Sequence, residues 1–124
     1  MHSLRALLVE DDCVINADIC GVLEDLGIFV TVAYSANTAI EFIDSGEYLK
    51  VLLTDIDLGE GLNGFDVANH ARKCYPKLPV VFLSGTMAAR YAAEGVPGSE
   101  FVAKPFHPFQ IRDAIGRTCG LEAA

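Results

Sequence analysis

Short runs of apolar residues alternate along the chain with longer segments in which apolar and polar residues recur with a helical period. The apolar runs lie at residues 4–9, 28–33, 50–54, 80–83 and 100–103. A continuous apolar run of this length is typical of a strand that is covered on both faces, as the strands of parallel sheets are. The pattern therefore predicts five buried, parallel strands.

The segments between these runs have the spacing of amphipathic helices. The first helix is predicted over residues 13–26 and ends at Gly27; its apolar positions are Ile15, Ile19, Val22, Leu23 and Leu26. The second begins after Ser35, a suitable N-cap, and ends near Gly46. Further helices are predicted over 64–74, 87–94 and 108–118. The last has apolar positions at Phe109, Ile111, Ala114 and Ile115, and Phe106 and Phe109 are expected to anchor it in the core.

This alternation of strand and helix predicts an α/β fold, with a doubly wound parallel sheet and helices on both faces. The 124 residues, of which 52% are hydrophobic, fit a single domain over residues 1–124 without an internal repeat or linker. No apolar run approaches the roughly 20 residues of a membrane span, and the start of the chain lacks the form of a signal peptide. We therefore expect a cytoplasmic protein that does not contact a membrane.

The chain is strongly acidic, with a formal net charge of −8 and an isoelectric point near 4.6. Nucleic-acid binding requires a basic patch, so direct contact with nucleic acid is not expected. The cysteines form no CxxC pair and are predicted to be free thiols, buried or half-buried; they are Cys13, Cys20, Cys74 and Cys119. The scattered histidines are not predicted to be ligands or catalytic bases; they are His2, His70 and His107.

The acidic residues that suggest chemistry stand where the predicted strands end. Glu10 and Asp11 follow the first strand, and Asp55 and Asp57 follow the third. Because ligands of open α/β sheets bind outside the carboxyl ends of the strands, these acids are expected to face a common pocket. Crowded carboxylates need a proton or a cation to neutralise them, and oxygen ligands suit a hard ion. The sequence therefore predicts an Mg2+ site at this edge of the sheet.

Two further strand ends add a hydroxyl and an ammonium group, Ser84 after the fourth strand and Lys104 before Pro105 after the fifth. Taken alone, Lys104 would pass for a solvated charge, and Asp12 for a turn residue or a helix cap. Together with the acids, these groups suit phosphoryl transfer. A carboxylate can form an aspartyl phosphate, and a divalent ion, a lysine and a hydroxyl can hold the phosphoryl oxygens.

The motifs LLVEDD, VLLTDID, VVFLSG and FVAKPF, in this order, resemble those of the receiver domain of two-component response regulators. The resemblance covers nearly the whole chain and implies a flavodoxin-like fold with strand order 2-1-3-4-5. It also implies that Asp55 accepts a phosphoryl group from a phosphohistidine on a sensor histidine kinase or a histidine phosphotransfer protein. A downstream protein that the sequence does not identify would then detect the conformational change. Such a domain is not an enzyme beyond its own phosphorylation and dephosphorylation.

The resemblance assigns the metal ligands as well. Glu10 and Asp11 would organise Mg2+, with Asp11 the more direct ligand. Asp55 and the main-chain carbonyl of Asp57 would complete the protein ligands. These assignments come from the matched motifs and not from spacing alone.

On the same resemblance, Ser84 would sense the phosphoryl group, Lys104 would contact one of its oxygens, and Phe101 would be the aromatic switch. Two segments depart from the family pattern. The loop 58–64 looks like a one-residue insertion, which leaves the acceptor in place. The segment 86–98 is rich in small residues and glycine, and loosely resembles a subgroup of stand-alone receivers with a remodelled fourth helix. We expect it to have few large apolar anchors and to be the most mobile part of the domain.

Other functions remain open on the sequence. The DxD motif at 55–57 resembles that of haloacid-dehalogenase-type phosphohydrolases, but these carry a further acidic pair after the lysine, and none follows Lys104. A flavodoxin-like redox module would need a Ser/Thr-rich loop after the first strand, where this chain has three acids that would repel a flavin phosphate. A degenerate receiver and the receiver fragment of a hybrid histidine kinase are the remaining alternatives.

Overall fold

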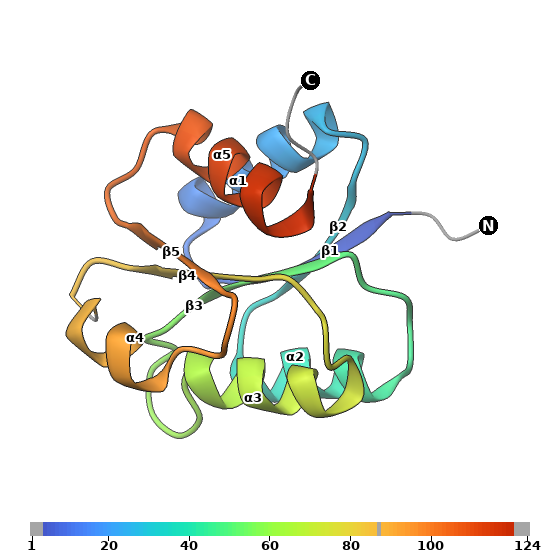
Figure 1. The fold of residues 1–124 in the computed structure, drawn as a ribbon, viewed down its shortest axis with the longest axis vertical. Coiled ribbons are helices and arrows are strands. Elements are labelled where there is room, and N and C mark those ends of the chain that lie inside the picture. Colours follow the sequence, from blue (N-terminus) through green and yellow to red (C-terminus); the bar gives the residue numbers. More distant parts are fainter. Residues whose placement is uncertain (1–3, 87, 121–124) are drawn as a thin grey trace.

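The computed structural model of the protein describes residues 4–86 and 88–120. Met87, at which the fourth helix was predicted to begin, and both ends of the predicted domain 1–124 lie outside the described residues. In chain order the elements are β1 (Arg5–Val9), α1 (Cys13–Asp25), β2 (Phe29–Ala33), α2 (Ala36–Asp44), β3 (Val51–Asp55), α3 (Gly64–Cys74), β4 (Val80–Ser84), α4 (Ala88–Glu94), β5 (Glu100–Ala103) and α5 (Pro108–Cys119). The predicted alternation of strand and helix is confirmed (Figure 1).

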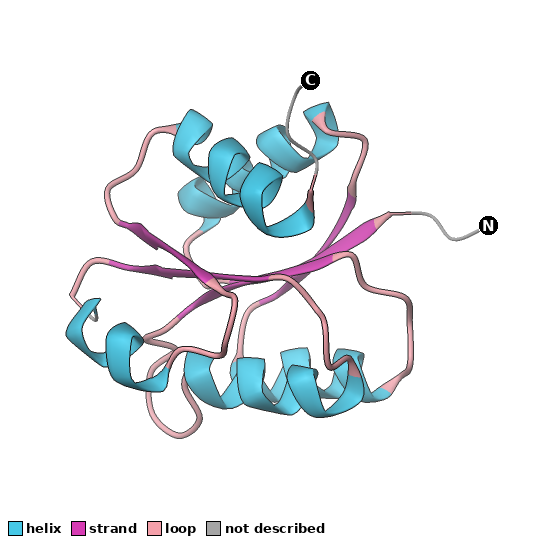
Figure 2. Ribbon diagram, viewed as in Figure 1, coloured by secondary structure: helices cyan, strands magenta, loops and turns pink. Residues whose placement is uncertain are grey.

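The strands form one parallel sheet in the order β2-β1-β3-β4-β5, as the flavodoxin-like fold requires (Figure 2). Every residue of β3 and β4 is buried. Strands in this position contact helices on both faces, which explains why they have continuous apolar runs rather than an alternating pattern. All strands point the same way, so their carboxyl ends share one edge of the sheet.

Two helical layers cover the sheet, with α1 and α5 on one face and α2, α3 and α4 on the other (Figure 1). Each layer closes its own hydrophobic core, because successive side chains of a strand point to opposite faces. On β3, Leu52 packs into the core beside α2 and α3, whereas Val51 and Leu53 pack into the core beside α1 and α5. No helix in the described part of the chain is both long and apolar enough to cross a membrane.

Polar side chains fix where the helices begin. Ser35 caps α2 by accepting a hydrogen bond from the backbone N–H of Thr38 at 3.2 Å, as the sequence predicted. Asp12 caps α1 in the same way. Asn63 and Asp66 form a reciprocal capping box at the start of α3. Such caps contribute about 0.5–2 kcal/mol each and set the ends of the loops that carry the site.

Some burial predictions were wrong. Phe109 is 57% exposed instead of anchoring α5, because the second position of the helix lies on the solvent side, where its ring contacts His107. Phe106 is half-buried and does pack against the core. Cys13 and Cys74 are free but exposed rather than buried, since they occupy the first position of α1 and the last position of α3.

The segment after β4 has an apolar anchor that the sequence analysis missed. Tyr91 of α4 packs between Phe82 and Phe101, with ring centroids 5.7 and 5.1 Å away. Its hydroxyl donates a hydrogen bond to the Ser99 carbonyl oxygen at 2.8 Å. Val96 is buried in the same core. Few large apolar residues were expected here, yet Tyr91 and Val96 fix α4 to the sheet.

Candidate functional site

The strand-end residues meet in a cleft of about 460 Å³ at the carboxyl edge of the sheet. Its lining residues are Glu10, Asp11, Asp12, Ile15, Asp55, Asp57, Gly59, Ser84, Gly85, Thr86 and Lys104. The structure therefore brings together six of the seven site residues that the sequence singled out. Phe101, the seventh, is not among the lining residues and packs against Tyr91 instead.

Asp55 is the last residue of β3 and is only 7% exposed. The backbone around it is held on two sides. The N–H of Ile56 donates to the Leu83 carbonyl oxygen of β4 at 3.0 Å, and the N–H of Gly64 donates to the Ile56 carbonyl oxygen at 2.8 Å. A Cβ at Gly64 would clash with the backbone carbonyl of Asp55, so only glycine lets α3 begin this close to the strand end. The loop 58–64 therefore ends at Gly64, directly beside the strand end that carries Asp55.

The acidic turn after β1 presents Glu10 inward and Asp11 outward. Glu10 is 1% exposed, whereas Asp11 is exposed at the cleft. One Glu10 carboxylate oxygen accepts a hydrogen bond from the backbone N–H of Asp12 at 3.2 Å. The Glu10 carbonyl accepts another from the buried side-chain amide of Asn16 at 2.9 Å. These two hydrogen bonds hold the backbone of the turn, from which the exposed Asp11 side chain extends.

Asn16 is a positioning residue that the sequence analysis missed. It lies three positions before Ile19, on the stripe of α1 that is otherwise apolar and buried. A polar residue in such a stripe usually has a hydrogen-bonding task, since burial of an unpaired amide is unfavourable. The polar residue that interrupts this apolar period is the feature of the sequence from which the role of Asn16 could have been predicted.

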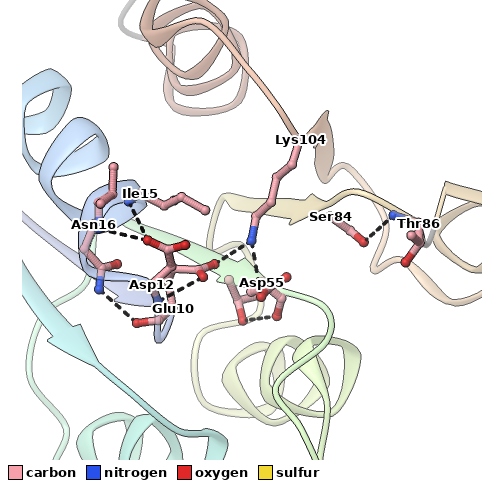
Figure 3. Close-up of polar contacts among 10 residues, drawn as sticks. Glu10, Asp12, Ile15, Asn16, Asp55, Ser84, Thr86 and Lys104 are labelled. Atoms are coloured by element: carbon pink, nitrogen blue, oxygen red, sulfur yellow. Dashed lines mark hydrogen bonds and ion pairs between the residues drawn. The ribbon is translucent and has the colours of Figure 1, made fainter.

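Lys104 connects the two buried carboxylates. Its ammonium nitrogen, Nζ, lies 2.8 Å from Glu10 Oε2 and 3.3 Å from Asp55 Oδ2. Figure 3 shows the side chain extending from the end of β5 to a point between Glu10 and Asp55. The backbone N–H of Lys104 donates to the Ser84 carbonyl oxygen at 2.9 Å, and its peptide bond to Pro105 is cis. The lysine is therefore part of the built site rather than a solvated charge.

The cleft holds more negative charge than Lys104 neutralises. Burial raises the pKa of Asp55 above its usual value, although Lys104 partly opposes the shift. Burial also raises the pKa of Glu10, and the Asp55 charge adds to the effect. Burial alone would lower the pKa of Lys104, but hydrogen bonds and charge from Glu10 and Asp55 outweigh it and leave that pKa raised. These shifts indicate a site that favours a further positive charge.

The donor set suits a hard divalent cation. One carboxylate oxygen from each of Glu10, Asp11 and Asp55 lies within 4.8 Å of the others. Oxygen-only coordination by a few carboxylates, completed by water, is typical of Mg2+ sites. The Asp57 carboxylate accepts a hydrogen bond from the Gly59 N–H at 3.2 Å, so this side chain shapes the loop beside the cleft. The residues present therefore fit Mg2+.

Ser84 lies at the end of β4, across the cleft from the acidic turn (Figure 3). It is 3% exposed, and its hydroxyl oxygen accepts a hydrogen bond from the backbone N–H of Thr86 at 3.2 Å. Thr86 also lines the cleft and was not singled out as a site residue from the sequence. A hydrogen bond thus links the Ser84 hydroxyl to the segment that leads into α4.

Comparisons with known proteins agree with this geometry. The family model of the response regulator receiver domain matches residues 6–116. A crystal structure of a response regulator receiver protein from Sinorhizobium medicae superposes with a TM-score of 0.91 and 33% identity, covering 95% of each chain. The receiver domain of the sensor histidine kinase PA1611 from Pseudomonas aeruginosa, described with a magnesium ion in its active-site cleft, has a TM-score of 0.78 and 24% identity, covering 94% of this chain and 97% of that one.

A longer curated relative is the phyllosphere-induced regulator PhyR of Methylorubrum extorquens, which is 28% identical over 112 residues. The match covers 90% of this chain but only 42% of PhyR, so the chain spans less than half of that relative. The matched family model extends from β1 into α5 and includes every strand end that forms the cleft. The chain therefore belongs to the receiver domains of two-component response regulators.

Proposed function

We propose that this receiver domain is phosphorylated on the Asp55 carboxylate and relays the signal through a conformational change. The observation that carries the proposal is the contact of Lys104 with both Glu10 and Asp55 inside the acidic cleft. The contact supports the proposal because a carboxylate that could act as the nucleophile lies beside a cation that could hold a transferred phosphoryl group. The proposed domain comprises residues 1–124 as one unit.

In the proposed reaction, an Asp55 carboxylate oxygen attacks the phosphorus atom of a phosphohistidine. A phosphorus–oxygen bond forms, the phosphorus–nitrogen bond breaks, and its electron pair stays on the imidazole nitrogen; the other ring nitrogen of the phosphohistidine carries a proton, so the histidine leaves in its neutral form. Asp55 suits this task because its carboxylate lies at a fixed strand end, and catalysis of phosphoryl transfer depends mostly on positioning and charge. Hydrolysis of the acyl phosphate by water would reset the domain.

Mg2+ would be held by Glu10, Asp11, Asp55 and the main-chain carbonyl of Asp57. When bound, it offsets negative charge on the phosphoryl oxygens. Support comes from the three carboxylate oxygens that lie within 4.8 Å of one another and from the raised pKa values of Asp55 and Glu10. The magnesium in the related PA1611 receiver domain makes the same ion a natural candidate here.

The switch would begin when a phosphoryl oxygen replaces the carboxylates as the partner of Lys104. The Ser84 hydroxyl would donate a hydrogen bond to another phosphoryl oxygen, and because the same hydroxyl oxygen accepts from the Thr86 N–H, its reorientation would be transmitted to Thr86. Lys104 follows β5, and Phe101 of β5 packs on Tyr91 of α4. A shift of Lys104 or Thr86 would therefore reach α4 through contacts that the fold already provides.

Receiver domains act with histidine kinases or phosphotransfer proteins, and are signalling domains rather than enzymes in the ordinary sense. For this chain the phosphodonor would be a sensor histidine kinase or a histidine phosphotransfer protein in the cytoplasm, and the output would be a contact with another protein. The only enzymatic activity proposed is its own phosphorylation and dephosphorylation. Membership of the receiver family leaves the phosphohydrolase alternative without support.

The direct test is phosphorylation by acetyl phosphate in the presence of Mg2+. The mass should rise by one phosphoryl group that alkali removes, as expected for an acyl phosphate, and Asp55→Asn should abolish the change. Asp57→Asn is the matched control, because it removes a neighbouring carboxylate but keeps the main-chain carbonyl, and it should still be labelled. Equal labelling of Asp55→Asn and the wild type would refute the assignment.

A further inference from the structure

A second group of potential metal ligands lies on the helical layer formed by α2 and α3, outside the acidic cleft. Asp44 is the last residue of α2, and His70 and Cys74 belong to the last two turns of α3. One donor atom from each of these residues lies within 4.8 Å of the other two. The two helices lead into β3 and β4, so the group is at the amino edge of the sheet, opposite Asp55.

The donors have the spacing of a chelating site. His70 and Cys74 are four positions apart on α3, which places their side chains on one face of the helix, one turn apart. A ligand pair at i and i+4 is a recurrent way for a helix to hold zinc. The Asp44 Oδ1 atom lies 2.6 Å from His70 Nε2, so α2 supplies the third donor across the helix–helix contact.

Charges of both signs lie around this position. Asp44 and Cys74 both end helices, and the unpaired carbonyls at a helix C-terminus carry partial negative charge. Two basic residues, Arg72 and Lys73, lie in the last turn of α3. Arg72 is engaged elsewhere, since its Nε donates to the Leu78 carbonyl oxygen at 2.8 Å. A metal would thus be attracted by the Asp44 carboxylate and by two helix ends, against the positive charges of Arg72 and Lys73.

The supporting backbone is fixed on both sides of the group. The Tyr75 hydroxyl donates a hydrogen bond to the Glu47 carbonyl oxygen at 2.6 Å, which ties the loop after α2 to the end of α3. The ligand side chains themselves remain accessible: Cys74 is exposed, and the His70 and Asp44 side chains are 33% and 56% exposed. A metal could therefore enter from solvent, and only side-chain rotations would be needed to bind it.

We propose that Asp44, His70 and Cys74 form a binding site for a divalent transition metal of the zinc class. Zinc accepts carboxylate, imidazole and thiolate ligands at about 2.0–2.3 Å, and three protein ligands leave the fourth tetrahedral position to water. The bound metal would require a deprotonated Cys74 thiolate and would cross-link α2 to α3. A thiolate and an imidazole are poor ligands for Mg2+, so the site is chemically distinct from the cleft.

The test uses Co2+ and Zn2+ on the full chain, with a reducing agent that is not itself a thiol. Co2+ should produce the absorption of a cobalt–thiolate bond at one metal per monomer. Added Zn2+ should displace the Co2+ and so remove this absorption. Cys74→Ser should abolish that absorption, and His70→Ala should weaken Zn2+ affinity at least about tenfold, because even the loss of an outer-shell partner costs about 10–100-fold. Zn2+ should also raise the unfolding temperature of the wild type.

Two matched controls separate this site from others on the chain. Cys13→Ser removes another exposed thiol and should keep the absorption. Asp11→Asn removes a carboxylate of the Mg2+ cleft and should keep it as well. The proposal would be overturned by a wild type without cobalt–thiolate absorption, by an absorption that survives Cys74→Ser, or by a metal bound only between two chains. None of these outcomes depends on phosphorylation of Asp55.

Discussion

At the residue scale, Lys104 is the side chain that joins the two buried carboxylates of the cleft. The sequence places it next to Pro105, and a lysine there could simply be solvated. In the structure its side chain is 20% exposed and contacts two buried carboxylates. A cation in this position stabilises the fold more than a surface lysine would, because its loss leaves Glu10 and Asp55 buried without their partner.

Lys104→Ala should therefore lower the free energy of unfolding in the absence of Mg2+ by about 1–3 kcal/mol, between the values for exposed and buried ion pairs. Urea denaturation would measure this loss. Lys104→Met keeps the aliphatic stem and separates the loss of charge from the loss of packing. Both variants should still be phosphorylated slowly, but neither should show the amide shifts near Thr86 and Phe101 that follow phosphorylation. A complete wild-type response in Lys104→Met would show that the ammonium is not part of the switch.

Asp11 differs from the other cleft acids because it is exposed and has no lysine contact in the described structure. We expect Mg2+ to raise the unfolding temperature of the wild type through mass action, and Asp11→Asn to lose most of this response. Asp12→Asn is the control, since it removes a charge from the same turn while asparagine still caps α1. The measurement is the unfolding temperature of the wild type and both variants at increasing Mg2+ concentration. An equal rise in all three proteins would mean that Asp11 does not bind the ion.

At the element scale, α4 is the least supported helix of the domain. It is seven residues long, and Tyr91 provides its main contact with β4 and β5. Short helices gain little from their own hydrogen bonds, so this tertiary contact determines whether α4 is formed. The anchor also links α4 to Phe101, which gives the proposed switch a physical route from β5.

Tyr91→Phe should keep the ring packing and remove the hydrogen bond to the Ser99 carbonyl, at a cost of about 0.5–1.5 kcal/mol. We expect amides in 88–98 to exchange faster in this variant, whereas those of β3 and β4 remain protected. In the wild type the same segment should exchange faster than the central strands and slow down when a phosphate mimic is bound. Uniform protection of α4 and β4 in both proteins would contradict this account.

At the scale of the whole molecule, the acidic cleft lowers the stability of the folded state, because burial disfavours the ionised forms of Asp55 and Glu10. The folded state raises the pKa of Asp55 and Glu10, so it holds protons more tightly than the unfolded chain does. Between the unfolded and folded pKa values the folded state binds more protons, and the free energy of unfolding must fall as pH rises through this window. Below the unfolded pKa both states are protonated and the cost vanishes.

Asp55→Asn should therefore be more stable than the wild type at pH 7 without Mg2+, and the difference should shrink as the pH falls towards the unfolded value of about 3.9. Urea denaturation between pH 7 and pH 4 would measure it. Asp57→Asn, in which the substituted side chain lies at the loop, should follow the wild-type profile. A variant Asp55→Asn that is less stable than the wild type at pH 7 would mean that ionised Asp55 supports the fold.

The sequence by itself determined the order of strands and helices, the family and six of the residues that line the cleft. Continuous apolar runs predict strands covered on both faces, and residues that follow parallel strands must meet at one edge. Such local patterns can be identified without knowing how the elements pack. The one-residue insertion expected in the loop 58–64 stays a prediction, whereas the close approach of α3 to β3 at Gly64 is seen in the structure.

Only the tertiary structure decided which side chains touch. The contact of Lys104 with Glu10 joins residues 94 positions apart, and no local pattern reports how deeply such a pair is buried. The packing of Tyr91 on Phe101 and the approach of Asp44 to His70 likewise arise from neighbouring elements. These contacts depend on distances across the fold, whereas periodicity records only which face of its own element a residue occupies.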